Sequence, residues 1–138
     1  MTAADAAAVA RLTTQLGYPA RAGEVGARLE HLRRYPDDEV LVAVDATDAV
    51  IGWIHVSRTT SLQESDLASI GGLVVDDGHR SSGIGADLVR AAEEWARQHG
   101  ATRMVVRSRS TRERTHRFYE RMGYAELKRS HVFGKPLV

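Results

Sequence analysis

The residues best suited to chemistry form the turn Arg80-Ser81-Ser82-Gly83-Ile84-Gly85, shortly after the apolar run Leu73-Val74-Val75. A strand that leads through a glycine-containing turn into a helix presents unpaired backbone N–H groups at the positive end of the helix dipole. Gly83 and Gly85 allow a phosphate to approach the backbone without interference from a Cβ atom, and Arg80 adds a positive charge. The spacing therefore predicts a pyrophosphate site.

Two other phosphate-binding motifs fit this turn less well. A P-loop requires Lys and then Ser or Thr after its second glycine, and no glycine of the turn is followed by lysine. A dinucleotide fingerprint requires a third glycine at position 88, which is Leu88. An ordinary strand-to-helix turn, with glycines that serve packing alone, stays open as the structural alternative.

Apolar residues at helical spacing predict four helices around this turn. Thr2 and Asp5 have capping-box spacing at the start of the first helix, and Ser110 and Glu113 have it at the start of the fourth. The periodic residues are Val9, Leu12 and Leu16, then Val25, Leu29 and Leu32, then Ile84, Leu88, Ala92 and Trp95, and last Phe118, Tyr119 and Met122. Gly17, Gly100 and Gly123 stand where helices end.

Runs rich in β-branched residues predict five strands. They are Val40 to Val44, Val50 to Val56, Leu67 to Val75, Thr102 to Arg107 and Tyr124 to Phe133, with residues 57–65 as a polar loop. Paired glycines inside a strand, here Gly71-Gly72, indicate a bulge or a close backbone approach. Two helices, three strands, then helix, strand, helix and strand predict an α/β fold that is not a doubly wound parallel sheet.

Composition restricts the chemistry further. With 138 residues, of which 43% are hydrophobic and 27% charged, we expect one globular domain over residues 1–138. The formal charge of +1 indicates neither a nucleic-acid nor a membrane partner, and no apolar run approaches the roughly 18 residues that span a bilayer. Seven arginines between Arg103 and Arg121 alternate with Glu113 and Glu120, which is typical of a solvated helix face.

Cysteine is absent, so disulfides, thiolate metal sites and a cysteine nucleophile are excluded. The six histidines show no i, i+4 pair or acidic partner at ligand spacing, and we expect no metal. A reducing, cytoplasmic setting follows as the expectation. Direct transfer between two bound substrates is preferred over a covalent enzyme intermediate, because no nucleophilic triad is identifiable.

Two motifs resemble the GNAT superfamily of N-acetyltransferases. Val75-x-Asp77-x-x-Arg80-x-x-Gly83-Ile84-Gly85 looks like its acetyl-CoA-binding motif, and His116 to Tyr124 resembles its second signature, a helix that ends in Gly-Phe or Gly-Tyr. The motifs stand in the family's order, and the resemblance covers nearly the whole chain. It implies a single α/β domain with a mixed, mostly antiparallel sheet that is splayed between strands four and five and flanked by helices.

The resemblance also implies roles for individual residues. The backbone of Leu73, Val74 and Val75 would pair with the pantetheine arm, and Gly71-Gly72 would start the splay. Arg80, Ser81, Ser82, Gly83, Ile84 and Gly85 would hold the pyrophosphate. Tyr119 matches the general acid that protonates the departing thiolate, a task within reach of a phenol whose pKa is about 10. An aromatic side chain packed on an amphipathic helix is the alternative for Tyr119.

The chain departs from the family pattern where relatives carry a basic glutamate. Ser69 stands in that region of the strand and cannot accept the amine's proton. Asp66, Glu64 and His55 are the candidates, and Trp53 shares a strand face with His55, so that both could lie beside the acceptor. A satisfied strand histidine is the alternative, and no base is assigned. Arg112 and Thr115 replace an asparagine and a small residue, which affects expected cofactor contacts.

The sequence thus predicts transfer of an acetyl group from acetyl-CoA to a primary amine. The layout, Gly17-Tyr18-Pro19 and His131-Val132-Phe133 look like small-molecule acetyltransferases, including those that modify aminoglycosides. A protein or peptide amine is a second acceptor class, and a non-catalytic acyl-CoA sensor is the alternative function. Short GNAT-like domains often pair through their C-terminal strands, so a homodimer is expected.

Overall fold

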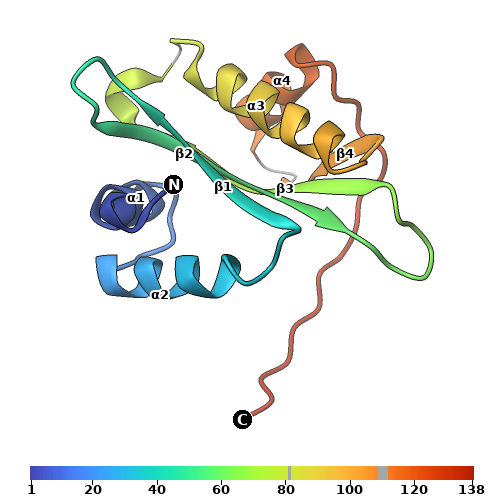
Figure 1. The fold of residues 1–138 in the computed structure, drawn as a ribbon. Coiled ribbons are helices and arrows are strands. Elements are labelled where there is room, and N and C mark those ends of the chain that lie inside the picture. The colour runs from blue at the N-terminus through green and yellow to red at the C-terminus, as the bar shows by residue number, and fades with distance from the viewer. Residues whose placement is uncertain (81, 109–111) are drawn as a thin grey trace. The chain divides into compact units, whose positions relative to one another are not determined.

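The computed structural model describes residues 1–80, 82–108 and 112–138 (Figure 1). They form two compact units, Met1–Arg107 and Ser108–Val138. No helix within the described ranges is both long and apolar enough to cross a membrane. Ser81 and Ser110, which take part in the predicted turn and in the second predicted capping box, lie outside the described residues.

The first unit is built on a sheet of four strands. They are β1 (Asp38–Val44), β2 (Val50–Thr59), β3 (Leu67–Val75) and β4 (Arg103–Val106), and they lie in the order β1-β2-β3-β4. The first two pairings are antiparallel and the third is parallel, which confirms a mixed, mostly antiparallel sheet. β2 is three residues longer than predicted, since Ser57 to Thr59 pair with Leu67 to Ser69 and so leave the polar loop.

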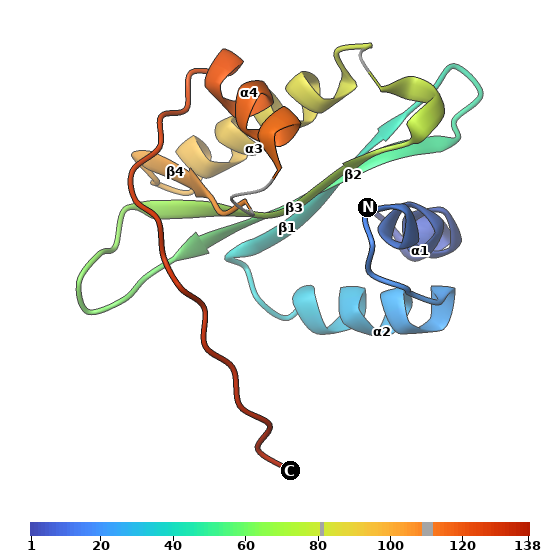
Figure 2. The ribbon, with the colours of Figure 1, turned by 180° about the vertical axis from the view of Figure 1, so that it is seen from behind.

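Helices cover both faces of this sheet (Figures 1 and 2). A 3-10 turn, η1 (Ala3–Asp5), leads into α1 (Ala6–Gln15) and then α2 (Ala22–Leu32) on one face, while α3 (Ile84–Gln98) crosses the other. The predicted capping box is confirmed, because the Asp5 carboxylate accepts a hydrogen bond of 2.7 Å from the Thr2 N–H. The side chains of Leu12, Ile54, Val56 and Val89 are fully buried between these layers.

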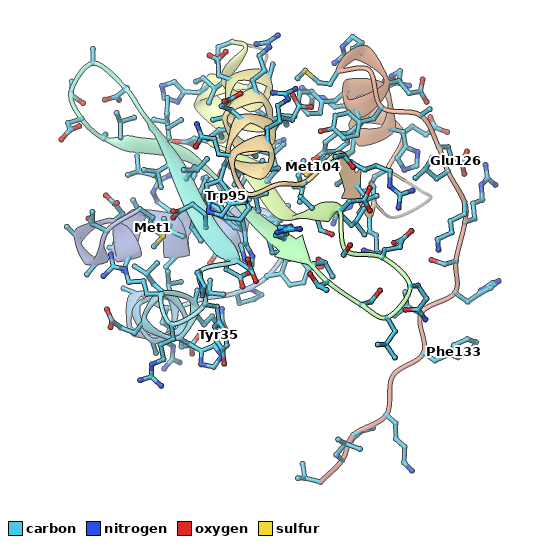
Figure 3. All side chains as sticks on the ribbon, turned by 45° about the vertical axis from the view of Figure 1, so that its right-hand side comes forward. Met1, Tyr35, Trp95, Met104, Glu126 and Phe133 are labelled. Atoms are coloured by element: carbon cyan, nitrogen blue, oxygen red, sulfur yellow. The ribbon has the colours of Figure 1, made fainter. Side chains whose placement is uncertain are left out.

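Each face of the sheet has its own packing. Val9, Ala10 and Leu12 of α1 form a cluster with Val50 and Val74, against which Trp53 packs. On the opposite face, Ala68, Ala96 and Ala101 form a cluster that Trp95 of α3 and Met104 of β4 complete (Figure 3). Such contacts follow from the alternation of side chains along the strands, which directs successive residues to opposite faces.

The expected bulge lies at Gly71. His55 pairs with Gly72 and Val56 pairs with Ile70, so Gly71 is the extra residue of β3. β4 pairs with β3 along its whole length, with Arg103 to Val106 opposite Leu67 to Ile70, and it ends where the bulge begins. β3 continues to Val75, which gives the opening predicted between the fourth and fifth strands of the family.

The second unit contains α4 (Glu113–Arg121), which ends at Gly123 with a positive φ of 94°. The strand predicted from Tyr124 to Phe133 is wrong, since no secondary structure is assigned beyond Gly123 (Figure 3). A strand is stable only where a neighbour receives its backbone groups, and no pairing with this segment is described. Its apolar side chains are exposed at Leu127, Val132 and Phe133.

Substitution of Gly72 will test the packing at the bulge. A Cβ atom at Gly72 would lie 2.7 Å from Cη2 of Trp53, so Gly72→Ala must displace the indole ring. We expect the free energy of unfolding to fall by about 1–3 kcal/mol, measured by urea denaturation. Gly26→Ala is the control, because a Cβ there has no neighbour within 4 Å and alanine favours α2 by about 1 kcal/mol. Equal stability of Gly72→Ala and the native protein would contradict this packing.

Candidate active site

The turn predicted to bind an anion lies between β3 and α3. After Val75, a short 3-10 helix (Asp77–His79) leads to Arg80 and then to Gly83, the N-cap of α3. Gly83 adopts φ 85° and ψ 0°, a left-handed conformation that an L side chain rarely adopts. The glycine is therefore required by the backbone itself, in addition to leaving the approach to the helix open.

Helix α3 directs its N-terminus at this turn. Asp87 N–H bonds to the Gly83 carbonyl at 3.0 Å and closes the first turn of the helix. The N–H groups of Ile84, Gly85 and Ala86 precede that bond and have no carbonyl partner within the helix. These donors and the dipole of a helix of 15 residues favour an anion here.

Side chains around the turn bond mostly to one another. Arg80 Nη2 lies 2.8 Å from Asp77 Oδ1, and the Ser82 hydroxyl donates to the carbonyl of His79. The Arg80 guanidinium is thus engaged by a neighbouring carboxylate, and the backbone of the turn is the part left to meet a ligand. Helix α1 fixes the start of the turn, because Gln15 Oε1 accepts a bond of 3.3 Å from Asp77 N–H.

The second part of the site is the open edge of β3. Asp76 N–H bonds to the Ile51 carbonyl of β2 at 2.8 Å. Since bonded and non-bonded pairs alternate in an antiparallel ladder, the main-chain groups of Val74 point to β2 and those of Leu73 and Val75 point away from it. Beyond the bulge, β4 no longer pairs with this edge. The buried Val74 side chain belongs to the core, as expected.

His55 and Trp53 lie on one face of β2, as their spacing predicted. The Trp53 ring covers Gly72, and His55 Nδ1 lies 3.2 Å from the position of a Cβ atom on Gly71. His55 Nε2 lies 2.8 Å from Asp38 Oδ1 at the start of β1. The indole Nε1 of Trp53 is buried and has no hydrogen-bond partner among the described residues.

The other two candidate bases lie at the far end of β3. Asp66 precedes the strand and lies five positions before Gly71, about 16 Å along an extended chain. Its carboxylate accepts a hydrogen bond of 2.6 Å from the Thr102 hydroxyl, which lowers the pKa of the Asp66 carboxyl. Glu64 Oε1 accepts a bond of 2.6 Å from Arg103. The structure therefore separates both carboxylates from the face that holds Trp53 and His55.

Tyr119 lies on α4 in the second unit. Its ring makes edge contacts with Phe118 and Tyr124, with centroids 5.0 and 5.5 Å apart. Burial raises the pKa of Tyr119 to about 12, because the charged phenolate loses its water. The ordinary phenol value of about 10 expected from the sequence is thus too low. At neutral pH the hydroxyl keeps its proton and is a hydrogen-bond donor.

Comparison with known proteins identifies the family. The model of the acetyltransferase (GNAT) family matches residues 8–124. The chain belongs to this family. The resemblance seen in the two motifs is confirmed, and so is the enzyme class that it implies, an N-acetyltransferase that uses acetyl-CoA.

Two curated relatives of this GNAT chain cover different shares of it. Aminoglycoside N(6')-acetyltransferase type 1 of Klebsiella aerogenes is 30% identical over 101 residues, which are 71% of this chain and 66% of the relative. Acetyl transferase GW6a of Oryza sativa subsp. japonica is 32% identical over 126 residues, 83% of this chain and 30% of the relative. The match thus spans about two thirds of the first relative's length and under a third of the second's.

Solved structures agree on the fold. Aminoglycoside N-acetyltransferase AAC(6')-Iy in complex with CoA superimposes with a TM-score of 0.84 at 17% identity, over 99% of this chain and 96% of that one. A likeness at this identity concerns the fold.

Within the part of the chain that the structure describes, no group of three His, Cys, Asp or Glu side chains could hold a metal ion.

Sequence patterns did not reveal the partner of His55. Asp37-Asp38 follows Pro36 and has the composition of a turn, yet β1 begins at Asp38. Asp38 lies opposite Ser57 and Val40 lies opposite His55, so the carboxylate and the imidazole are diagonal neighbours on one face. The length of the hairpin turn sets the register of the two strands, and side chains alternate between the two faces of each strand. Together these two features of the sequence could have predicted that Asp38 and His55 are neighbours.

Gly83→Asp will test the anion site at the N-terminus of α3. We expect acetyl-CoA to raise the Tm of the native protein and to leave that of Gly83→Asp unchanged, because a carboxylate there opposes the pyrophosphate. Gly100→Asp is the matched control, since Gly100 has nearly the same φ, 82°, and lies just beyond the other end of the same helix. A full thermal shift with folded Gly83→Asp would place the anion site elsewhere.

Proposed function

We propose that this chain transfers an acetyl group from acetyl-CoA to a primary amine of a small molecule. The observation that carries the proposal is the edge of β3 beyond Ile70, which β4 leaves unpaired and which leads through the turn after Val75 to the N-terminus of α3. An open strand edge can pair with the amide groups of a pantetheine arm, and a helix N-terminus favours its pyrophosphate. Both features belong to the first unit and share the turn that follows Val75.

Residues of the turn and of the strand edge would divide the binding of acetyl-CoA between them. The main chain of Leu73 and Val75 offers free groups to the pantetheine, while Val74 supports the strand from the core. The backbone from Ser81 to Gly85 would meet the pyrophosphate, with Arg80 contributing through its main chain. One or two of the arginines between Arg103 and Arg121 would meet the 3′-phosphate.

Acyl transfer in this site would be direct. When bound, acetyl-CoA supplies the acetyl group as a thioester, and its sulfur leaves as a thiolate that needs a proton. Tyr119 Oη would supply that proton, because a phenol is protonated at neutral pH and burial raises the pKa of Tyr119 further, to about 12. The chain has no cysteine that could carry the acetyl group. A complex that holds both substrates at once is therefore the simplest mechanism.

The acceptor we propose is a small-molecule amine such as an aminoglycoside. Support comes from the Klebsiella relative, whose name states this activity, and from the AAC(6')-Iy fold. A protein or peptide amine is the alternative acceptor. We further propose that residues 1–138 act as one domain, as a homodimer and in the cytoplasm. The described C-terminal residues form no strand that could pair across a dimer. The observation that supports the dimer is the exposure of the apolar side chains of Val132 and Phe133.

Release of free thiol from acetyl-CoA, measured with a panel of amines, will test the proposed function. The panel contains aminoglycosides, simple diamines and lysine peptides. We expect turnover with the aminoglycosides or diamines, while turnover with peptides alone would identify a protein acceptor. If acetyl-CoA raises the Tm and no amine releases thiol, the chain is a non-catalytic sensor and the proposal is wrong.

Tyr119→Phe will test the proton donor. We expect kcat to fall by about 10² to 10⁴-fold, while the thermal shift with acetyl-CoA stays unchanged, since only one hydroxyl is removed. The alkaline limb of kcat should lie near pH 12, where the buried phenol loses its proton, and should be absent from the variant. A loss below about threefold at saturating substrates would assign Tyr119 to packing, with water protonating the thiolate.

Stability at high pH provides the control for this variant. A raised pKa in the folded state means that Tyr119 contributes stability below pH 10, which is lost as the pH rises toward about 12. Two pKa units correspond to roughly 2 to 3 kcal/mol. Tyr119→Phe should lack this part of the alkaline decline. A loss of more than about 1 kcal/mol at pH 7 would instead reveal a buried hydrogen bond of the hydroxyl.

A further inference from the structure

His55 and Asp38 form a pair that the proposed transfer has not yet used. His55 Nε2 and Asp38 Oδ1 are 2.8 Å apart, and the two side chains are 28% and 23% exposed. This exposure is enough for the imidazole to exchange protons with solvent or a ligand. It is also low enough for the carboxylate to hold the ring in one orientation through a charge-assisted bond.

The pairing decides which ring nitrogen can accept a proton. A carboxylate only accepts hydrogen bonds, so Nε2 of neutral His55 carries the hydrogen and donates it to Asp38. Nδ1 then has the free lone pair, and it has no hydrogen-bond partner among the described residues. The structure therefore leaves the basic nitrogen of His55 available, in the same way that a carboxylate orients a catalytic histidine elsewhere.

This nitrogen faces the point where the sheet opens. A Cβ atom on Gly71 would lie 3.2 Å from Nδ1, so any larger residue at the bulge would crowd the ring. β4 ends opposite Ile70, so from Gly71 onward β3 exposes the edge proposed for the pantetheine arm. Nδ1 is thus next to the start of that edge, on the sheet face opposite α3, where the proposed transfer would bring the amine.

Among the described residues, charged groups come near the ring from β1 and from the start of the chain. Asp38 approaches from β1, whereas β3 contributes Gly71 and Gly72, and the neighbours of His55 on the same face of β2 are Trp53 and Ser57. The ammonium group of Met1 bonds to the Val40 carbonyl at 3.0 Å, and Val40 lies opposite His55. Asp66 and Glu64 bond to Thr102 and Arg103 near the other end of β3.

We propose that His55 Nδ1 accepts the proton of the acceptor ammonium and that Asp38 positions the ring for this step. The proposal rests on the acetyl transfer proposed above. The ammonium nitrogen carries three protons and the amide product keeps one, so two must leave. Nδ1 takes the first and passes it to solvent, and the freed lone pair of the amine forms the bond to the acetyl carbon. The carbon–sulfur bond then breaks, the nitrogen releases its second proton to solvent, and the thiolate takes a proton from Tyr119, which solvent restores.

The test uses His55→Gln, Asp38→Asn and the native protein with kanamycin, or with the amine of the panel that releases thiol fastest. At pH 7 we expect His55→Gln to lower kcat/KM by about 10² to 10⁴-fold. Asp38→Asn should lower it in the same direction, because an amide can donate to Nε2 and move the ring proton onto Nδ1. His99→Gln, at the C-terminal end of α3, is the matched control and should leave the rate unchanged.

The pH profile separates a proton acceptor from a structural residue. Without the base, the variant depends on the free amine already in solution, so its rate should climb until the pKa of the amine, about 10. The native rate should level off at a lower pH, and the deficit of His55→Gln should shrink to less than about tenfold at pH 9.5. A deficit equal at pH 7 and pH 9.5 would overturn the proposal, as would a loss below threefold at pH 7.

Acetyl-CoA binding distinguishes the possible failures. Both variants should keep the native thermal shift with acetyl-CoA, because neither residue belongs to the turn or the strand edge. If His55→Gln does not fold, Asp38→Asn carries the same test, since its rate must recover at pH 9.5 as well. Native protein that releases thiol while both variants match it would refute the pair alone. Absence of turnover by the native protein would remove the proposed function and the pair together.

Discussion

One extra residue in β3 marks the start of the strand edge on which the proposed cofactor site depends. Gly71 has no counterpart on β2, and the ladder shifts there by one position. The parallel pairing with β4 ends at Ile70, immediately before the bulge. β4 itself ends at Val106, opposite Ile70, so β3 runs on to Val75 without a strand partner on that side. Leu73 and Val75 keep free main-chain groups there, which the proposed pairing with the pantetheine arm requires.

Glycines allow other elements to approach this opening closely. A Cβ on Gly52 would lie 3.1 Å from Leu88 of α3, and one on Gly72 would meet the Trp53 ring. Helix α3 therefore packs tightly on one face, which holds its N-terminus at the end of β3. The indole packs on the other face beside His55. Close van der Waals packing therefore fixes the positions of the anion site and of the imidazole.

Burial and hydrogen bonding prepare the two proposed proton-transfer groups in opposite ways. Tyr119 is buried, and desolvation keeps its hydroxyl protonated far above neutral pH. His55 is partly exposed, and the Asp38 carboxylate fixes the hydrogen on Nε2 and leaves Nδ1 free. A protonated donor and an acceptor whose Nδ1 has no partner among the described residues suit a reaction that releases a thiolate and consumes an ammonium.

Local sequence patterns established the helices, the turn at Gly83, the bulge and the family, because each depends on residues that are near one another in the chain. Tertiary structure alone paired His55 with Asp38, tied Asp66 to Thr102 and raised the pKa of Tyr119. It also overturned the strand expected from Tyr124 to Phe133. These features depend on strand register, on a pairing neighbour and on burial, which arise only when distant segments pack together.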